Sequence, residues 1–365
     1  MHLSTPKTWR GGEQQVLYLA KYLQSVGIHQ IVACRTDSEM QKRCESDSIP
    51  FAAMPMRSEL DIGTIRKIIR TVKENQINIL HAHTAKAHSI GLLAMKWGGL
   101  SKLGVRFVVT RRVDFKIRPG FLSRMKYQSK AVDRYIAISE NVRQILIGDG
   151  IADSRIRIAY SGIDTNRLAT LPDASSLRQE FNITNDTVVF GNVAALVDHK
   201  DQETLVKAVG LLKDKELPRF IVMIVGEGEL RSKLESLVQS LNIADKVIFT
   251  GFRNDIPSFY SLFDIFVLSS KEEGLGTSVL DAMSAGLPVI ATRGGGIPEM
   301  IVPEQGGLLS DVKDAEGLAL NLAFALQNQS LWPKWAKFNK DKVGQFDYHE
   351  TGRCNLEIYS ELLNS

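Results

Sequence analysis

The chain has 365 residues, of which 44% are apolar and 24% are charged. This length predicts two domains of ordinary size, and this composition excludes the disordered and fibrous classes of protein. No apolar run approaches the ~20 residues of a membrane-spanning helix, and no basic segment followed by an apolar core opens the chain, so we expect neither a spanning segment nor a secretory signal.

The net charge of +4 is distributed unevenly along the chain. Residues 1–166 carry 26 Lys and Arg against 14 Asp and Glu, whereas residues 167–365 carry 19 against 27. We therefore expect the first half to meet an anionic partner. The sequence has no aromatic-rich basic stripe of the kind that binds nucleic acid. An anionic membrane face or a phosphorylated glycolipid is therefore the better candidate for the partner. The three widely separated cysteines favour a reducing compartment, and we predict a cytoplasmic protein, peripheral at the inner face of the membrane if the basic half binds lipid.

Strand-like and helix-like runs alternate through the first half, which predicts βαβ units and a parallel sheet. Met1–Ser4 resembles the end of a first strand that is either truncated or short. Gly11 and Gly12 then open a helix through Leu23, and Gly27 stops it. The remaining expected elements are strands at His29–Cys34, Ile77–His83, Val105–Thr110, Tyr135–Ser139 and Ile156–Tyr160, and helices at Ile62–Lys73 and through Ile90 and Leu93.

His81 and His83 close the expected strand Ile77–His83, and open α/β sheets bind ligands at the ends of their strands. Two histidines at this spacing suit a metal, but the sequence shows no third cluster of ligands, so we predict no metal site. We expect His83 at the polar edge of a ligand cleft. A purely structural histidine is the alternative for His81.

The most basic segment is 111–134, where eight Lys or Arg residues stand against two Asp and apolar residues are interspersed. Arg111 and Arg112 are expected to hold an anionic acceptor, because guanidinium binds phosphate or carboxylate through two parallel N–H bonds. Two alternatives stay open for the segment. It can be a solvated charged surface, or it can lie on a bilayer surface.

The second half repeats this alternation without repeating the sequence of the first, and we place the domain boundary near Asn166. Buried strands are expected at Val188–Val193 and Phe220–Val225. The second of these leads into Gly226–Gly228, which could start a dinucleotide fingerprint, but the third glycine of that fingerprint is missing.

The stretch after the apolar run Ile265–Leu268 carries the strongest chemical signal. That run is typical of a buried parallel strand. Gly274 and Gly276 form a turn after it, and Thr277 or Ser278 can cap the helix that follows. Unpaired N–H groups at such a helix start, together with the positive end of the helix dipole, predict a phosphate site.

Two acidic residues flank this predicted phosphate site, Glu273 and Asp281. A carboxylate beside a phosphate is unfavourable unless it binds hydroxyls, so the pair predicts a phosphate attached to a sugar. The stretch resembles the sugar-nucleotide site of the retaining glycosyltransferases of family 4, whose pattern reads EGFGLxxLEAMAxGxPVVAT and then GGxPE. The matching segments of this chain are EGLG at 273–276, LDAM at 280–283, GLPVIAT at 286–292 and GGIPE at 295–299.

The resemblance implies the α/β class and the GT-B fold, in which two Rossmann-like, doubly wound parallel-sheet domains face a central cleft. Residues 1–166 would form the N-terminal, acceptor-side domain and residues 167–349 the nucleotide-sugar domain. The C-terminal helix at about 350–365 would pack back on the first domain. The resemblance also implies transfer with retention of configuration and without a metal or other cofactor.

The same resemblance implies roles for individual residues. Lys200 would lie beside the donor diphosphate and Glu273 on the donor sugar, and these two residues are the catalytic candidates. Arg253 would stack on the base, with a structural surface role as its alternative, and Asp281 would hold the ribose hydroxyls. The donor-binding set is Gly11, Gly12, Arg253, Gly274, Gly276, Thr277, Ser278 and Asp281, and the acceptor or cleft set is His83, Arg111 and Arg112.

Three positions depart from the family pattern. Asp281 stands in place of Glu, Ala195 in place of an Arg that touches the diphosphate, and Arg112 in place of a sugar-contacting His. We predict a glycosyltransferase that acts on an anionic or lipid-linked glycan acceptor in bacterial surface polysaccharide or lipopolysaccharide synthesis. The alternatives are a nucleotide-sugar epimerase, whose expected acids and histidines are not evident in the first half, and a non-catalytic donor-binding homologue.

Overall fold

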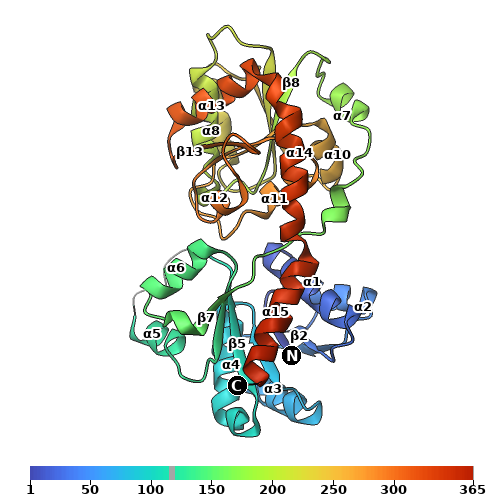
Figure 1. Ribbon diagram of the computed structural model, residues 1–365, viewed down its shortest axis with the longest axis vertical. Helices are drawn as coiled ribbons and strands as arrows, with labels where there is room; N and C mark the ends of the chain where they lie inside the picture. Colours follow the sequence, from blue (N-terminus) through green and yellow to red (C-terminus); the bar gives the residue numbers. More distant parts are fainter. Residues whose placement is uncertain (115–119, 365) are drawn as a thin grey trace. The chain divides into compact units, whose positions relative to one another are not determined.

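The computed structural model describes residues 1–114 and 120–364, and the chain folds into two compact units (Figure 1). Unit 1 comprises Met1–Gly162 and Tyr348–Ser365, and unit 2 comprises Ile163–Asp347. The chain first leaves unit 1 after Gly162, four residues before the boundary expected at Asn166. Residues 115–119, which include two of the basic residues of the segment 111–134, lie outside the described residues.

Unit 1 is built on a seven-stranded parallel sheet in the order β3-β2-β1-β4-β5-β6-β7. Its inner strands are almost completely buried, as expected where helices cover both faces of a parallel sheet. The strands are β1 His2–Ser4, β2 Val32–Arg35, β3 Phe51–Met54, β4 Ile79–Ala82, β5 Arg106–Arg111, β6 Arg134–Ala137 and β7 Ile156–Ile158.

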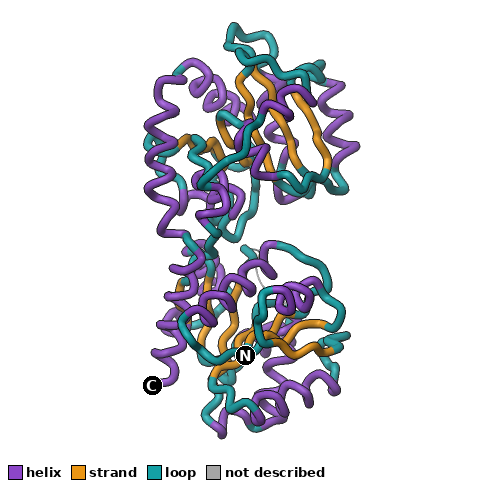
Figure 2. The backbone as a smooth tube through the Cα atoms, turned by 90° about the vertical axis from the view of Figure 1, so that its right-hand side faces the viewer, coloured by secondary structure: helices purple, strands orange, loops and turns teal. Residues whose placement is uncertain are grey.

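The helices of unit 1 flank this sheet (Figure 2). They are α1 Gly11–Ser25, α2 Glu39–Ser46, α3 Ile62–Glu74, α4 Ala85–Gly98, α5 Phe121–Tyr127, α6 Glu140–Gly148 and α15 Tyr348–Leu363, with short 3-10 helices η1 Leu100–Leu103 and η2 Asp153–Arg155. The last helix, α15, lies along α1 (Figure 1). Its residues Ile358, Tyr359 and Leu362 share a buried cluster with Leu19 and Leu23 of α1.

Unit 2 is built on a six-stranded parallel sheet in the order β10-β9-β8-β11-β12-β13. Its strands are β8 Val188–Val193, β9 Phe220–Val225, β10 Val247–Gly251, β11 Ile265–Leu268, β12 Val289–Thr292 and β13 Gly307–Ser310. Its helices are α7 Ser175–Glu180, α8 Gln202–Leu211, α9 Arg231–Ser240, α10 Ile256–Leu262, α11 Thr277–Ser284, α12 Ile297–Met300, α13 Ala315–Gln327 and α14 Trp332–Val343. The 3-10 helices are η3 Thr165–Leu168, η4 Asp198–Lys200, η5 Gln329–Leu331 and η6 Gly344–Phe346.

The strand order reverses once in each unit, between β1 and β4 in unit 1 and between β8 and β11 in unit 2. Open α/β sheets bind ligands beside the loops at such a reversal. The predicted pair of Rossmann-like parallel sheets is therefore confirmed, and each sheet offers one such place. In the described part of the chain, no helix has both the length and the apolar character needed to cross a bilayer.

Candidate functional site

Lys200 and Glu273, the two catalytic candidates, meet at the strand-order reversal of unit 2. Lys200 ends η4, which follows β8, and Glu273 lies in the loop after β11. Lys200 Nζ forms an ion pair with Glu273 Oε1. Ser270 Oγ donates a hydrogen bond of 3.0 Å to the same oxygen. The side chains of Lys200 and Glu273 are only 18% and 10% exposed, so the pair is largely withdrawn from solvent.

Hydrogen bonds hold the loops around this pair in place. The amide of Lys271 donates to the carbonyl of His199 at 2.8 Å, and Lys271 Nζ pairs with Asp198 at 2.8 Å. The amide of Gly296 donates to the carbonyl of Glu273 at 2.9 Å. The loops after β8 and β11 are therefore tied to each other, which fixes the distance between a cation and a carboxylate that come from different parts of the chain.

Helix α11 begins beside Glu273 with no side-chain cap. Its N-cap is Gly276, which has a φ of 92°, and Thr277 is already the first helical residue. The prediction that Thr277 or Ser278 caps the helix is wrong, because glycine takes the N-cap position and a positive φ that other residues avoid. Within the first turn the amide of Val279 donates to the carbonyl of Gly276 at 2.9 Å, which leaves the N–H groups of Thr277 and Ser278 without an intrahelical acceptor or a side-chain cap. Gly274 lies in the loop that leads to this turn.

Asp281 lies in the second turn of α11 with an incompletely satisfied carboxylate. Its Oδ2 forms an ion pair of 2.7 Å with Arg167 of η3. Its Oδ1 is buried and has no hydrogen-bond partner among the described residues. Burial raises the pKa of Asp281, and Arg167 opposes that rise. An unpaired buried oxygen is unfavourable, and a ligand hydroxyl could satisfy it.

Arg253, the predicted base-stacking residue, is engaged within unit 2. Its guanidinium pairs with Glu180 at 2.6 Å and with Asp255 at 2.8 Å, and it lies 5.1 Å from the ring centre of Phe259. This geometry favours the structural alternative that the sequence left open. The residue before it, Phe252, is 73% exposed just after the carboxyl end of β10. Sequence reasoning did not single out Phe252, although it is an aromatic residue directly before the predicted base-stacking residue Arg253.

Unit 1 contains a cavity of about 700 Å³ beside the loops after β1, β4 and β5. Its lining includes the whole predicted acceptor or cleft set, His83, Arg111 and Arg112. Gly12 at the start of α1, from the predicted donor-binding set, lines it as well. Among the described residues, nothing lies within 4 Å of a Cβ added at Gly11, and at Gly12 the nearest atom is Arg112 Cδ at 3.8 Å. The double glycine thus leaves the backbone open on this side rather than making room for a neighbouring side chain.

The two neighbouring arginines of this cavity have different partners. Arg111 is 7% exposed, and it donates to the hydroxyl of Tyr127 at 2.9 Å and to the carbonyl of Val113 at 3.2 Å. Arg112 donates to Ser161 Oγ at 3.2 Å and lies 3.4 Å from Nδ1 of His83, while its Nε is buried without a partner. Arg112, rather than Arg111, is therefore the arginine with donor capacity left for a ligand.

The described residues contain one group of side chains with the spacing of metal ligands, namely His2, His81 and His83. The argument that no third ligand accompanies His81 and His83 was wrong. His2 lies 79 residues before His81, but parallel pairing of β1 with β4 places the two side by side. No local sequence pattern predicts such a contact, because it depends on the order of the strands.

Models of two protein families match the chain in turn. Residues 9–167 match Glycosyltransferase Family 4, and residues 173–342 match Glycosyl transferases group 1. The chain is a family 4 glycosyltransferase. The two matched segments correspond closely to the two units of this glycosyltransferase.

Relatives and solved structures agree with this assignment. The UDP-Gal:alpha-D-GlcNAc-diphosphoundecaprenol alpha-1,3-galactosyltransferase of Escherichia coli is 25% identical over 265 residues, which are 70% of this chain and 68% of the relative. The lipopolysaccharide core biosynthesis glycosyltransferase LpsE of Rhizobium meliloti is 31% identical over 204 residues, 56% of this chain and 57% of the relative. The crystal structure of Anabaena HepE in complex with UDP has a TM-score of 0.85 at 21% identity and covers 99% of both chains. The GT-B fold and the enzyme class predicted from the sequence are confirmed.

Proposed function

We propose that this glycosyltransferase moves a sugar from a nucleotide-diphosphate sugar to a phosphate-bearing or lipid-linked glycan acceptor, with retention of configuration and without a metal. The observation that carries the proposal is the meeting of Lys200 and Glu273 at the strand-order reversal of unit 2, beside the uncapped start of α11. A cation, a carboxylate and free amides in one place suit a ligand that combines phosphates with sugar hydroxyls.

The charge changes of the reaction explain why these groups belong together. Cleavage of the bond between sugar and phosphate adds negative charge to the departing diphosphate, while the sugar becomes cationic. Lys200 and the N–H groups at the start of α11 would stabilise the diphosphate, as preorganised dipoles do in a site that excludes water. Glu273 would orient the donor sugar, and the unpaired Oδ1 of Asp281 would accept a hydrogen bond from a ribose hydroxyl.

The nucleotide is proposed from a different part of unit 2. Phe252 follows β10 and exposes 73% of its surface, so its ring can stack on a base without first being uncovered. The fold neighbour HepE was crystallised with UDP. Uracil is therefore the first base to test for this chain.

The acceptor is proposed to bind in the cavity of unit 1. Arg112 has unused donor capacity there, and the excess of basic residues in the first half favours an anionic ligand. The acceptor named for the Escherichia coli relative is alpha-D-GlcNAc-diphosphoundecaprenol. A lipid-linked diphosphate would supply the anionic group, and it would bring the enzyme to the inner face of the membrane as a peripheral protein.

Incubation of the purified chain with UDP-, GDP- and ADP-sugars, with and without extracts of undecaprenyl-linked glycans, tests this function. The expected result is nucleotide diphosphate release that depends on the acceptor and persists in EDTA. Interconversion of sugars without an acceptor would identify an epimerase instead. Binding of nucleotide without release in any mixture would identify a non-catalytic homologue.

A further inference from the structure

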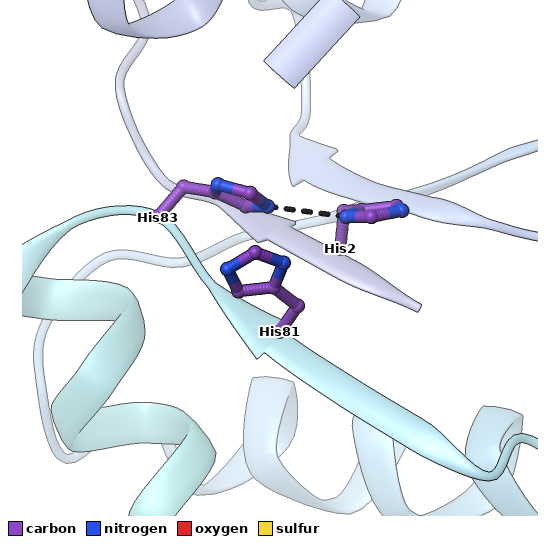
Figure 3. Close-up of side chains that lie close together, drawn as sticks. All are labelled: His2, His81 and His83. Carbon is purple, nitrogen blue, oxygen red and sulfur yellow. Dashed lines mark hydrogen bonds between the residues drawn. The ribbon is translucent and has the colours of Figure 1, made fainter. Parts of the chain in front are cut away.

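Three buried histidines lie on one face of the unit 1 sheet, where β1 pairs with β4 (Figure 3). His2 on β1 is in register with His81 on β4, and His83 follows His81 by two residues, which returns its side chain to the same face. Nδ1 of His2 lies 3.1 Å from Nε2 of His83, the contact drawn as a dashed line. All three residues are at most 4% exposed.

The hydrogen bonds of His83 have a direction, because a guanidinium can only donate. Arg112 donates from its NH2 nitrogen to Nδ1 of His83 at 3.4 Å. The proton of the neutral His83 ring must then be on Nε2, and this N–H donates to Nδ1 of His2. The result is an ordered chain from Arg112 through His83 to His2.

His81 stands beside this chain with both ring nitrogens in use. Its Nδ1 lies 2.6 Å from the hydroxyl of Tyr359, and its Nε2 lies 2.6 Å from Thr110 Oγ1. These contacts fix His81 between α15 and β5. His81 is therefore the satisfied structural histidine that the sequence left open as an alternative.

A metal ion is the other interpretation of three clustered imidazoles, and the contacts argue against it. Zinc would need three lone pairs aimed at one point about 2.0–2.1 Å from each nitrogen. Both nitrogens of His81 already face hydroxyl groups, and the contact between His83 and His2 is a hydrogen bond. The charged side chain that is hydrogen-bonded to the cluster is the cationic Arg112. Among the described residues, no Asp or Glu belongs to the cluster. A buried divalent cation would therefore have no anionic ligand.

The charge of Arg112 is only partly offset, because the Glu13 carboxylate in the lining of the same cavity favours the charged form of Arg112 without forming a close ion pair with it. Among the described residues, no carboxylate oxygen lies within 4.0 Å of its guanidinium nitrogens. Its partners, Ser161 and His83, are neutral hydrogen-bond acceptors. Burial lowers the pKa of the Arg112 guanidinium to about 10, which leaves it charged at neutral pH. A half-buried cation whose hydrogen-bond partners are neutral is stabilised further by an anionic ligand, and Arg112 lines a cavity that can admit one.

We infer that His83 and His2 are positioning residues whose hydrogen-bond chain fixes the guanidinium of Arg112 in the unit 1 cavity, where Arg112 binds a phosphate oxyanion. The inference rests on the proposed function, because this oxyanion belongs to the phosphate-bearing acceptor or to the donor diphosphate. In this role His83 and His2 act through Arg112 rather than by binding the phosphate themselves. They act by holding one nitrogen of Arg112 so that its other N–H groups point to the ligand.

Nitrogen NMR of the full chain with ¹⁵N-labelled histidine tests the hydrogen-bond chain without any substitution. The expected spectrum has His83 and His2 protonated on Nε2 at pH 7, and added Zn²⁺ changes neither signal. A proton on Nδ1 of His83 would overturn the inference, because that nitrogen could not accept from Arg112. Zinc-induced shifts of all three imidazoles would also overturn it by making the cluster a metal site.

Inorganic phosphate, titrated by calorimetry, measures the effect on the ligand. All variants carry Lys200→Ala, so that the proposed phosphate site of unit 2 does not contribute. Arg112→Met is expected to weaken phosphate binding at least about tenfold, and His83→Leu at least about threefold, because it removes the acceptor that holds Arg112. His83→Asn is expected to stay within about twofold, since its side-chain oxygen can replace Nδ1 as the acceptor. The exposed His29 of the same unit supplies the control His29→Asn, which should change nothing.

Unchanged phosphate binding in a folded His83→Leu variant, with loss in Arg112→Met, would overturn the positioning role. The sugar-transfer assay uses His83→Leu with Lys200 intact. A raised KM for the acceptor supports an acceptor phosphate as the ligand, and a raised KM for the nucleotide sugar supports the donor diphosphate. An unchanged KM for both would overturn the inference. Failure of the proposed function has a different signature, because no sugar is then transferred by the wild-type chain.

Discussion

Arg111 and Arg112 lie at the end of β5, and their guanidinium groups have different neighbours. Arg111 is bonded to Tyr127 and Val113 and is buried, so it ties β5 to the segment that follows. Arg112 has neutral partners and one nitrogen without a partner. Side chains with the same chemistry thus have a structural function in one case and a candidate binding function in the other.

This difference predicts effects of different size on stability for the same substitution at the two sites. Arg111→Met removes two hydrogen bonds from a buried charged group and should lower the free energy of unfolding by about 2–3 kcal/mol. Arg112→Met removes a half-buried charge that forms no close ion pair among the described residues, so the free energy of unfolding should change by less than about 1 kcal/mol. Urea denaturation of both variants checks this. A large loss in Arg112→Met and a small one in Arg111→Met would reverse the assignment.

Lys200 gives the second prediction at this scale. Lys200→Ala removes the cation expected to stabilise the leaving diphosphate, so kcat should fall at least tenfold, which corresponds to about 1.4 kcal/mol of activation free energy. Lys207 is the matched control, because its side chain is 50% exposed and pairs with Glu203 on the surface of α8. Lys207→Ala should keep the wild-type kcat. Unchanged turnover in Lys200→Ala would remove Lys200 from the mechanism.

At the scale of elements, buried strands were predicted best. The ranges predicted for β8, β9 and β11 agree with the structure residue for residue. A fully buried strand is a continuous apolar run, and its ends are visible where the run ends. The half-exposed edge strand β3, Phe51–Met54, was missed because its short sequence shows neither a long apolar run nor alternation.

The site residues were predicted less completely for a related reason. The motif around Glu273 identifies residues that one loop and one helix bring together, and the sequence carries that information locally. The contacts of His2 with His83 and of Arg253 with Glu180 join segments 81 and 73 residues apart. They depend on sheet order and on packing between elements, which no window of sequence contains.

The start of α11 gives a prediction for a whole element. Gly276→Ala introduces a Cβ at a φ of 92° and only 3.3 Å from Met300 Cε, so the unit should lose about 1–2 kcal/mol of stability. UDP binding should weaken as well, because the first N–H groups of α11 would turn away from their present direction. Gly344→Ala is the control, since Gly344 has a φ of −55° and nothing within 4 Å of an added Cβ among the described residues. That variant should be neutral or slightly stabilised, and equal loss in both variants would contradict the prediction.

At the scale of the whole molecule, buried histidines are concentrated in unit 1. Burial lowers the pKa values of His2, His81 and His83 well below the ordinary value, and it lowers the pKa of His88 to about 3. Unit 2 contains a single histidine, the exposed His199. The two units should therefore respond differently to acid.

The sign of that response follows from proton binding. Unfolding returns these imidazoles to a pKa near 6.5, so below that pH the unfolded state binds protons that the folded state does not. Below about pH 6.5 the stability of unit 1 should fall by up to about 1.4 kcal/mol per pH unit for each histidine. The amino group of Met1, whose pKa burial lowers to about 5, adds a decline of the same sign that begins at higher pH. Burial raises the pKa of the Glu13 carboxyl, and this contribution has the opposite sign.

Hydrogen–deuterium exchange, read separately for β4 in unit 1 and β8 in unit 2, measures this response between pH 7.5 and 5.5. Protection of β4, after correction for the intrinsic exchange rate, should decrease with acid more steeply than protection of β8. His88→Phe should reduce the slope of unit 1 alone, because it removes one buried imidazole whose ring nitrogens have no hydrogen-bond partner among the described residues. Equal slopes in the two units would mean that these histidines titrate in the folded chain, which contradicts their enclosure between the sheet and its helices.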